Sequence, residues 1–186
     1  MQTPLKFSVT TEITPNPAAM KFVFSSAIAQ DSCDFPDAQS TERSPLAAKI
    51  FGFPWVSQVF VGLNFVTITK QDWVDWKVLS NPLSGLLAEH VNSGQAVLLD
   101  IPKSADESDD DSEMVKQIKR VLNTEIKPVV QLDGGDIAFV RLENDNLYVQ
   151  LKGACSSCPS SQATLKDGIE VRIKQVFPSI KEVLAI

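Results

Sequence analysis

A run of acidic residues in the middle of the chain limits what the sequence can fold into. Between Ser104 and Glu113 lie six carboxylates and no base, in a segment without aromatic or β-branched residues. Such a segment cannot bury enough apolar surface to fold alone. Bases and acids nearly cancel on either side of it, so the net charge of -6 belongs to this segment. We therefore predict two small domains, residues 1–100 and 114–186, joined by an acidic flexible linker over residues 101–113.

The C-terminal domain is predicted to have the order αββαβ. Two segments have apolar residues at helical spacing. The first contains Val115, Ile118, Leu122 and Ile126 and is expected to end at Pro128. The second follows the cysteine loop and contains Leu165, Ile169, Ile173 and Val176. Three strands are predicted. Residues 137–142 are expected to be buried on both faces and residues 147–152 on one face, and residues 180–186 form the last strand. A hairpin followed by a crossover gives a three-stranded mixed sheet with both helices on one face.

The N-terminal domain reads as α+β without evident chemistry. Strands are expected in four segments, 5–13, 20–24, 56–61 and 65–69. A short helix is expected from Ser44 to Phe51. A longer one is expected over residues 72–91, which Pro82 breaks or kinks.

The most informative chemistry lies in a pair of cysteines, Cys155 and Cys158, two residues apart. Pro159 follows them and suits the first position of a helix. Cys158 would then lie at a helix N-terminus, where free N–H groups and the helix dipole favour a thiolate. The pair is expected to be reactive or to bind a metal centre.

Ligand counting leaves three alternatives for this pair. A cubane iron–sulfur cluster takes four thiolates, and structural zinc takes four ligands drawn from Cys and His. The C-terminal domain offers Cys155 and Cys158 and no histidine. Either the two are a redox pair, as in a thiol–disulfide oxidoreductase, or two chains share one centre, which a symmetric homodimer supplies. Ligand counting alone does not distinguish iron–sulfur from zinc.

The sequence resembles the Nfu-type proteins. In the C-terminal domain, residues 128–140 (PVVQLDGGDIAFV), 151–161 (LKGACSSCPSS) and 165–170 (LKDGIE) look like the C-terminal domain of NifU. In the N-terminal domain, residues 11–17 (TEITPNP), 20–23 (MKFV), 44–47 (SPLA) and 59–70 (VFVGLNFVTITK) resemble the domain that accompanies it.

This resemblance implies a carrier or scaffold rather than an enzyme. It implies a [4Fe–4S] cluster bound between two subunits of a homodimer, with Cys155 and Cys158 as ligands, and transferred to apo-proteins. An upstream assembly scaffold would supply the cluster, since the other domains of NifU are not seen in this chain. Mitochondrial members carry an import peptide; the start of this chain shows no such pattern, so we expect a cytoplasmic location.

Of the remaining candidates, Cys33 and His90 are expected to be structural. Cys33 lies in an acidic loop, which raises rather than lowers a thiol pKa, and His90 lies near the end of a helix with no second ligand. The segment from Asp133 to Asp136 is expected to be a turn or a close approach beside the cysteines, with neither aspartate a ligand. Gly153 and Ser157 could donate hydrogen bonds to sulfides.

Partners other than proteins are not expected. Trp55, Trp73 and Trp76 are expected in the core or at an interface, because no basic patch accompanies them, and this argues against nucleic-acid binding. No apolar stretch is long enough for a membrane span.

Overall fold

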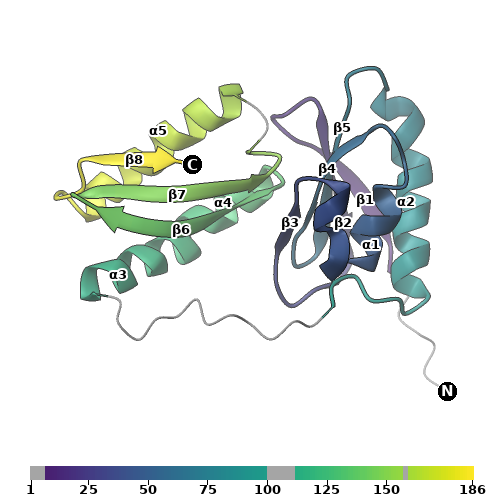
Figure 1. The fold of residues 1–186 in the computed structure, drawn as a ribbon, viewed down its shortest axis with the longest axis horizontal. Helices are drawn as coiled ribbons and strands as arrows, with labels where there is room; N and C mark the ends of the chain where they lie inside the picture. Colours follow the sequence, from purple (N-terminus) through teal and green to yellow (C-terminus); the bar gives the residue numbers. More distant parts are fainter. Residues whose placement is uncertain (1–6, 100–111, 157–158) are drawn as a thin grey trace. The chain divides into compact units, whose positions relative to one another are not determined.

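The chain divides into two compact units, residues 1–101 and 102–186. Each unit combines one sheet with helices, which confirms the α+β class (Figure 1). The computed structural model describes residues 7–99, 112–156 and 159–186. Within the last segment, residues 159–162, 164 and 165 are described by their backbone alone. Most of the predicted acidic linker therefore lies outside the described residues.

The N-terminal unit is built on a five-stranded sheet. Its strands are β1 (Val9–Ile13), β2 (Ala19–Phe24), β3 (Cys33–Phe35), β4 (Val56–Val61) and β5 (Phe65–Lys70). They lie in the order β1-β2-β5-β4-β3, and every neighbouring pair is antiparallel. The strand pattern of the sequence predicted four of them. It missed β3, because three residues are too few for a period of two to be recognised.

Helices cover one face of this sheet. The 3-10 helix η1 (Ala38–Arg43) leads into α1 (Pro45–Ile50), and α2 (Trp76–Asn92) follows the last strand. Side chains from α1, α2 and the sheet form one buried core: Phe22, Ile50, Val59, Ile68 and Leu87 are each fully buried.

A break or a kink was predicted at Pro82. The helix α2 runs through this proline, so the break is wrong. Pro82 offers no N–H to the carbonyl of Val78. The Val78 side chain is 69% exposed, so this turn lies on the solvent side, where water can bind the freed carbonyl. The helix thus continues past a residue that usually ends one.

The C-terminal unit has the predicted αββαβ order. Its three strands are β6 (Gly135–Glu143), β7 (Asn146–Gly153) and β8 (Glu182–Ala185). The sheet order is β6-β7-β8, with the first pair antiparallel and the second parallel, so the predicted mixed sheet is confirmed. Asn144 and Asp145 join β6 to β7 with φ of 53° and 65°, the left-handed values of a tight hairpin turn.

Both helical segments of this unit cover the same face of the sheet (Figure 1). The second segment is α5 (Pro159–Val176). Ile118 from the first segment and Ile173 from α5 pack with Leu147 and Val149 of β7 in one core. The alternation predicted for β7 is confirmed, because Leu147, Val149 and Leu151 are buried.

Two details of the predicted burial are wrong. Strand β6 is not buried on both faces: Val140 is 39% exposed, because both helical segments described in this unit pack on the other face of the sheet. On α5, Val176 is also exposed, and Phe177, just beyond the helix, packs into the core in its place.

The first helical segment does not stop at Pro128. It consists of α3 (Glu113–Val121), a π-helical turn η2 (Leu122–Ile126) and α4 (Lys127–Leu132). In η2 the N–H of Lys127 donates to the carbonyl of Leu122, five residues back. This wider turn makes room for the ring of Pro128, which then stands near the start of α4, where its missing N–H is tolerated.

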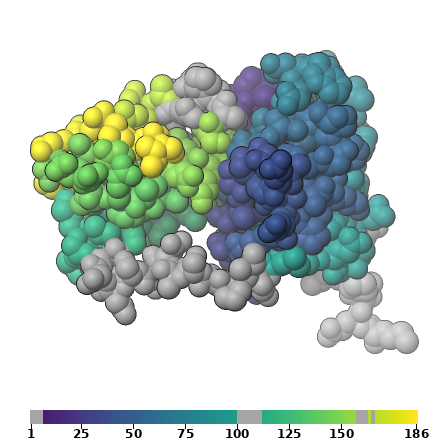
Figure 2. All heavy atoms as spheres, in the orientation of Figure 1, coloured from purple at the N-terminus to yellow at the C-terminus, as the bar shows by residue number. Residues whose placement is uncertain are grey.

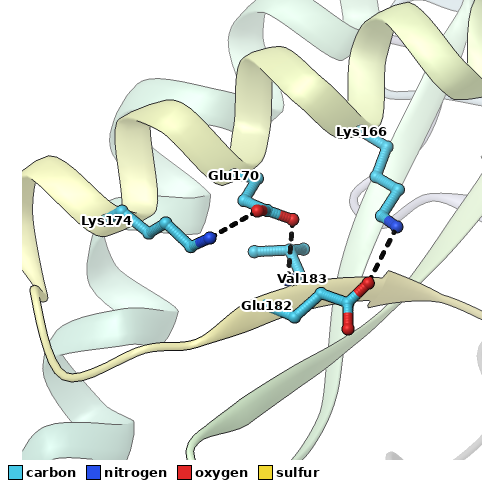
Figure 3. A network of polar contacts seen from close by, with 5 residues as sticks. All are labelled: Lys166, Glu170, Lys174, Glu182 and Val183. Carbon is cyan, nitrogen blue, oxygen red and sulfur yellow. Dashed lines mark hydrogen bonds and ion pairs between the residues drawn. The ribbon is translucent and has the colours of Figure 1, made fainter.

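A polar network ties α5 to β8 (Figure 3). Glu170 accepts a hydrogen bond of 2.5 Å from Lys174 Nζ and one of 3.1 Å from the backbone N–H of Val183. Lys166 Nζ lies 3.4 Å from Glu182 Oε1. The bonds from Lys174 and Val183 lower the pKa of the Glu170 carboxyl. The helix that follows the cysteine pair is therefore fixed to the last strand.

Candidate metal centre

Cys155 lies in the turn that follows β7. The strand ends at Gly153, whose φ of 66° turns the chain out of the sheet. Ser156 closes the turn, because both its N–H and its hydroxyl donate to the carbonyl of Gly153, at 3.1 and 2.9 Å. The side chain of Cys155 is only 2% exposed and packs at the edge of the core.

The second predicted ligand, Cys158, lies outside the described residues, as does Ser157. The helix α5 begins at Pro159, as predicted, so Cys158 directly precedes the first helical residue in the sequence. The structure therefore fixes the position of one predicted ligand, Cys155, and the start of the helix beyond the other.

Two adjacent glycines shape the surroundings of Cys155. Gly134 has a φ of 79° and closes the turn after α4, with its N–H donating to the carbonyl of Gln131. Gly135 pairs with Gly153 across β6 and β7. A Cβ at Gly135 would lie 2.6 Å from Cys155 Sγ and 2.6 Å from the carbonyl oxygen of Lys152. Of the two roles considered for this segment, Gly134 supplies the turn and Gly135 the close approach.

The sequence predicted a close approach beside the cysteines as one of two roles for this segment, but not which residues make it. Glycines at both ends of a future strand pair, here Gly135 and Gly153, were the available signal. Their register, which brings Gly135 beside the thiol, depends on the folded hairpin.

Beside this contact lies an ion pair between a buried carboxylate and a partly exposed lysine. The carboxylate of Asp136 is 4% exposed and lies 3.1 Å from Lys127 Nζ. Its Oδ1 also accepts the N–H of Ile137 at 2.9 Å. The carboxylate is thus neutralised by an ammonium group and oriented by the backbone, which is how a buried charge is made tolerable. This arrangement agrees with a structural role for Asp136.

The other candidate residues lie in the N-terminal unit. Cys33 is half-buried on β3, opposite Val61. His90 is 1% exposed, and its Nε2–H donates to the carbonyl of Ala96 at 3.0 Å, so it ties the end of α2 to the following loop. Trp55 packs in the core, whereas Trp73 is 69% exposed and is no core residue.

Two other kinds of site are absent from the part of the chain that the structure describes. Within residues 7–99, 112–156 and 159–186, no three His, Cys, Asp or Glu side chains gather in a way that could hold a metal ion. None of the helices in these segments has both the length and the apolar character needed to cross a bilayer.

Both halves of the chain match known protein families. The NifU-like domain matches residues 118–184, and the N-terminal domain of the scaffold protein Nfu/NifU matches residues 9–94. Together the two matches leave out little more than the acidic segment and the chain ends.

Curated relatives match across nearly the whole chain. NifU-like protein 5, mitochondrial, of Arabidopsis thaliana is 40% identical over 182 residues, which are 94% of this chain and 66% of the relative. The NFU1 iron-sulfur cluster scaffold homolog, mitochondrial, of Drosophila persimilis is 36% identical over 179 residues, covering 94% and 64%. The chain thus spans slightly less than two thirds of the length of these relatives.

A solved structure also matches, but too weakly to support an argument. The solution structure of a NifU-like protein from Saccharomyces cerevisiae gives a TM-score of 0.47 at 25% identity and covers 54% of this chain and 92% of that one.

These relatives correct one prediction and establish the family. Both relatives are named as mitochondrial proteins, which contradicts the cytoplasmic location predicted from the first residues of the chain. The family itself is confirmed by two matching domains in the expected order. The chain belongs to the Nfu-type family of NifU-like iron–sulfur cluster scaffold proteins.

Proposed function

We propose that the C-terminal unit carries a [4Fe–4S] cluster held between two copies of the chain, with Cys155 and Cys158 of each copy as ligands. The chain receives the cluster from an upstream assembly scaffold and hands it to apo-proteins. The cluster is cargo, so this protein is a carrier and not an enzyme. Since the curated relatives are named mitochondrial, we propose the same compartment for this chain.

The observation that carries this proposal is the position of Cys155. Its thiol lies at the end of β7, against a glycine that leaves room for sulfur, and just before the helix that follows the second cysteine. Each chain offers two closely spaced cysteines, and the described residues gather no further set of ligands. Because a cubane cluster takes four thiolates, a second chain completes the set.

The burial of Cys155 argues against the alternative, a thiol–disulfide oxidoreductase. An attacking thiol has to be reached by another disulfide, and reactive cysteines are partly exposed. The Cys155 side chain is 2% exposed. The relatives favour the carrier as well, since one of them is named an iron-sulfur cluster scaffold homolog.

The test is anaerobic reconstitution with iron and sulfide. We expect about four irons and four sulfides per dimer for the unchanged chain, with a doubled mass in solution. Cys155→Ala and Cys158→Ala should each abolish cluster binding. Cys33→Ala is the matched control, because Cys33 lies on β3 of the other unit, and it should bind the cluster normally.

The other outcomes identify the alternatives. Zinc bound without sulfide would indicate a structural metal site. A monomer without a cluster and with a rapidly cycling disulfide would indicate the redox enzyme. Transfer is tested by mixing the loaded protein with an apo-protein that takes a [4Fe–4S] cluster, separating the two and measuring iron in each. A cluster that stays with this chain would contradict the carrier role.

A further inference from the structure

The short helix α4 carries an exposed apolar face at the end of the unit that holds Cys155. Val129 is 53% exposed and Leu132 is 70% exposed. Residues three apart lie on the same face of a helix, so the two side chains are neighbours. Val130, between them in the sequence, is fully buried and points into the core. The α4 face, defined as Val129 and Leu132, is therefore turned away from the core of its own unit.

This face lies close to the thiol. Leu132 is the last residue of α4, and the carbonyl of Gly134, two residues on, accepts the N–H of Ala154 at 3.3 Å. Gly135 then touches Cys155. Leu132 and Gly135 are three positions apart in the chain, so their Cα atoms are at most about 11 Å apart.

We propose that the α4 face is the surface on which a second copy of this chain packs when the two share a cluster. This inference rests on the proposed function. A shared site with two equal halves requires a two-fold axis through the cluster, and residues next to that axis meet the same residues of the other copy. An apolar side chain beside the thiol is then covered by its own counterpart, and apolar surfaces are complementary to themselves.

The small size of the α4 face predicts that the contact between two copies forms only when they also share a cluster. Covering each side chain removes on the order of 100 Å² of apolar surface from water. Stable protein–protein interfaces bury roughly 1,200 Å² or more in total. The α4 face therefore stabilises a dimer that already shares a cluster. It is too small to hold two chains together without the cluster. Loss of the cargo should release the two copies from each other.

The test places a charge on the α4 face. Leu132→Glu puts two like charges beside the axis, while the exposed position lets the unit fold. Val171→Glu is the matched control, since Val171 is 59% exposed on α5 and lies twelve residues, about 18 Å along the helix, from its start. We expect Leu132→Glu to weaken the loaded dimer at least tenfold in anaerobic sedimentation, and Val171→Glu to leave it unchanged. Circular dichroism of the empty proteins should show both variants folded.

A charge exchange separates a contact across the axis from damage within one chain. Leu132→Lys should weaken the dimer as Leu132→Glu does, and an equimolar mixture of the two should recover it. If the unchanged chain forms no loaded dimer, the proposed function fails. If it does, and Leu132→Glu dimerises normally or the mixture fails to recover, this inference alone is overturned. Normal dimerisation with slower transfer to an apo-protein would assign the α4 face to the client instead.

Discussion

The N-terminal unit packs large aromatic side chains beneath its sheet, whereas the C-terminal unit relies on aliphatic ones. Phe22, Phe24, Phe35 and Trp55 are buried in the first core, and Phe177 is the one aromatic side chain among the buried core residues described for the second. The smaller unit also gives glycines, which add nothing to a core, to the strand ends beside Cys155. These glycines leave room for the thiol but add no apolar side chain to the core. The domain has about 75 residues, a size at which a core alone gives marginal stability.

The larger core and the cysteine pair therefore lie in different units of the chain. All three tryptophans lie in the N-terminal unit, and the single tyrosine, Tyr148, lies in the C-terminal one. Tryptophan fluorescence consequently reports on the N-terminal unit alone, while circular dichroism reports on both. This difference allows the comparison to be tested.

The largest effect should come from Ile173→Ala, which removes a fully buried side chain from the C-terminal core. A cavity of this kind lowers the free energy of unfolding by about 2–5 kcal/mol. In urea, the part of the circular dichroism transition due to the C-terminal unit should move to lower concentration, and the tryptophan transition should stay. Ile50→Ala, at an equally buried position of the other core, should do the reverse. If both variants move both transitions equally, the units unfold as one.

A smaller effect on stability, with a large one on cluster binding, is expected for Gly135→Ala. The added Cβ would lie 2.6 Å from Cys155 Sγ and from a backbone oxygen, so the strand or the thiol has to shift. Overpacking of this kind costs about 1–3 kcal/mol. Chemical denaturation would measure the loss, and reconstitution should give less iron per chain.

Gly168→Ala is the control for that substitution. Nothing lies within 4 Å of a Cβ at Gly168, which is inside α5, so alanine should raise stability by about 0.5–1 kcal/mol and leave cluster binding intact. Equal iron content in the Gly135→Ala protein and the unchanged one would show that the close approach does not position the ligand.

The smallest effect is expected for Glu170→Gln, which weakens the tie between α5 and β8 (Figure 3). The loss at neutral pH should be about 0.5 kcal/mol, typical of an i,i+4 helix pair. Because the folded pKa of Glu170 is lowered, its contribution is present above the unfolded pKa and is lost as the pH falls through the folded pKa. Urea midpoints of the two proteins should therefore converge in acid. A difference that stays constant would contradict this.

Much of the fold could be predicted from local patterns. The alternation of Leu147, Val149 and Leu151 indicated a strand with one buried face, and the Pro159 start of α5 followed from the fixed φ of proline. The errors came from tertiary context. The π-helical turn before Pro128 and the exposed turn at Val78, before Pro82, let helices continue where the sequence predicted an end or a break.

The candidate site could be predicted as a pair of residues but not as a geometry. The spacing of Cys155 and Cys158 and the resemblance to Nfu-type proteins predict these two cysteines as the ligands of a candidate metal centre. The contact of Gly135 with Cys155 depends on which residues face each other in the β6–β7 hairpin, and the ion pair of Lys127 with Asp136 joins a helix to a strand. Neither the strand register nor the helix position is contained in a local pattern. The compartment was mispredicted because it was judged from a few leading residues.

The hydrogen bond from Val183 to Glu170 has a consequence for how this protein avoids unwanted assembly. Strand β8 is at the rim of its sheet and lies at the surface of the unit (Figure 2), where free main-chain amides invite pairing with another molecule. One of these amides is already taken by the helix carboxylate, and the strand is only four residues long. Growth of the sheet into fibrils or irregular clumps is thereby discouraged at this rim.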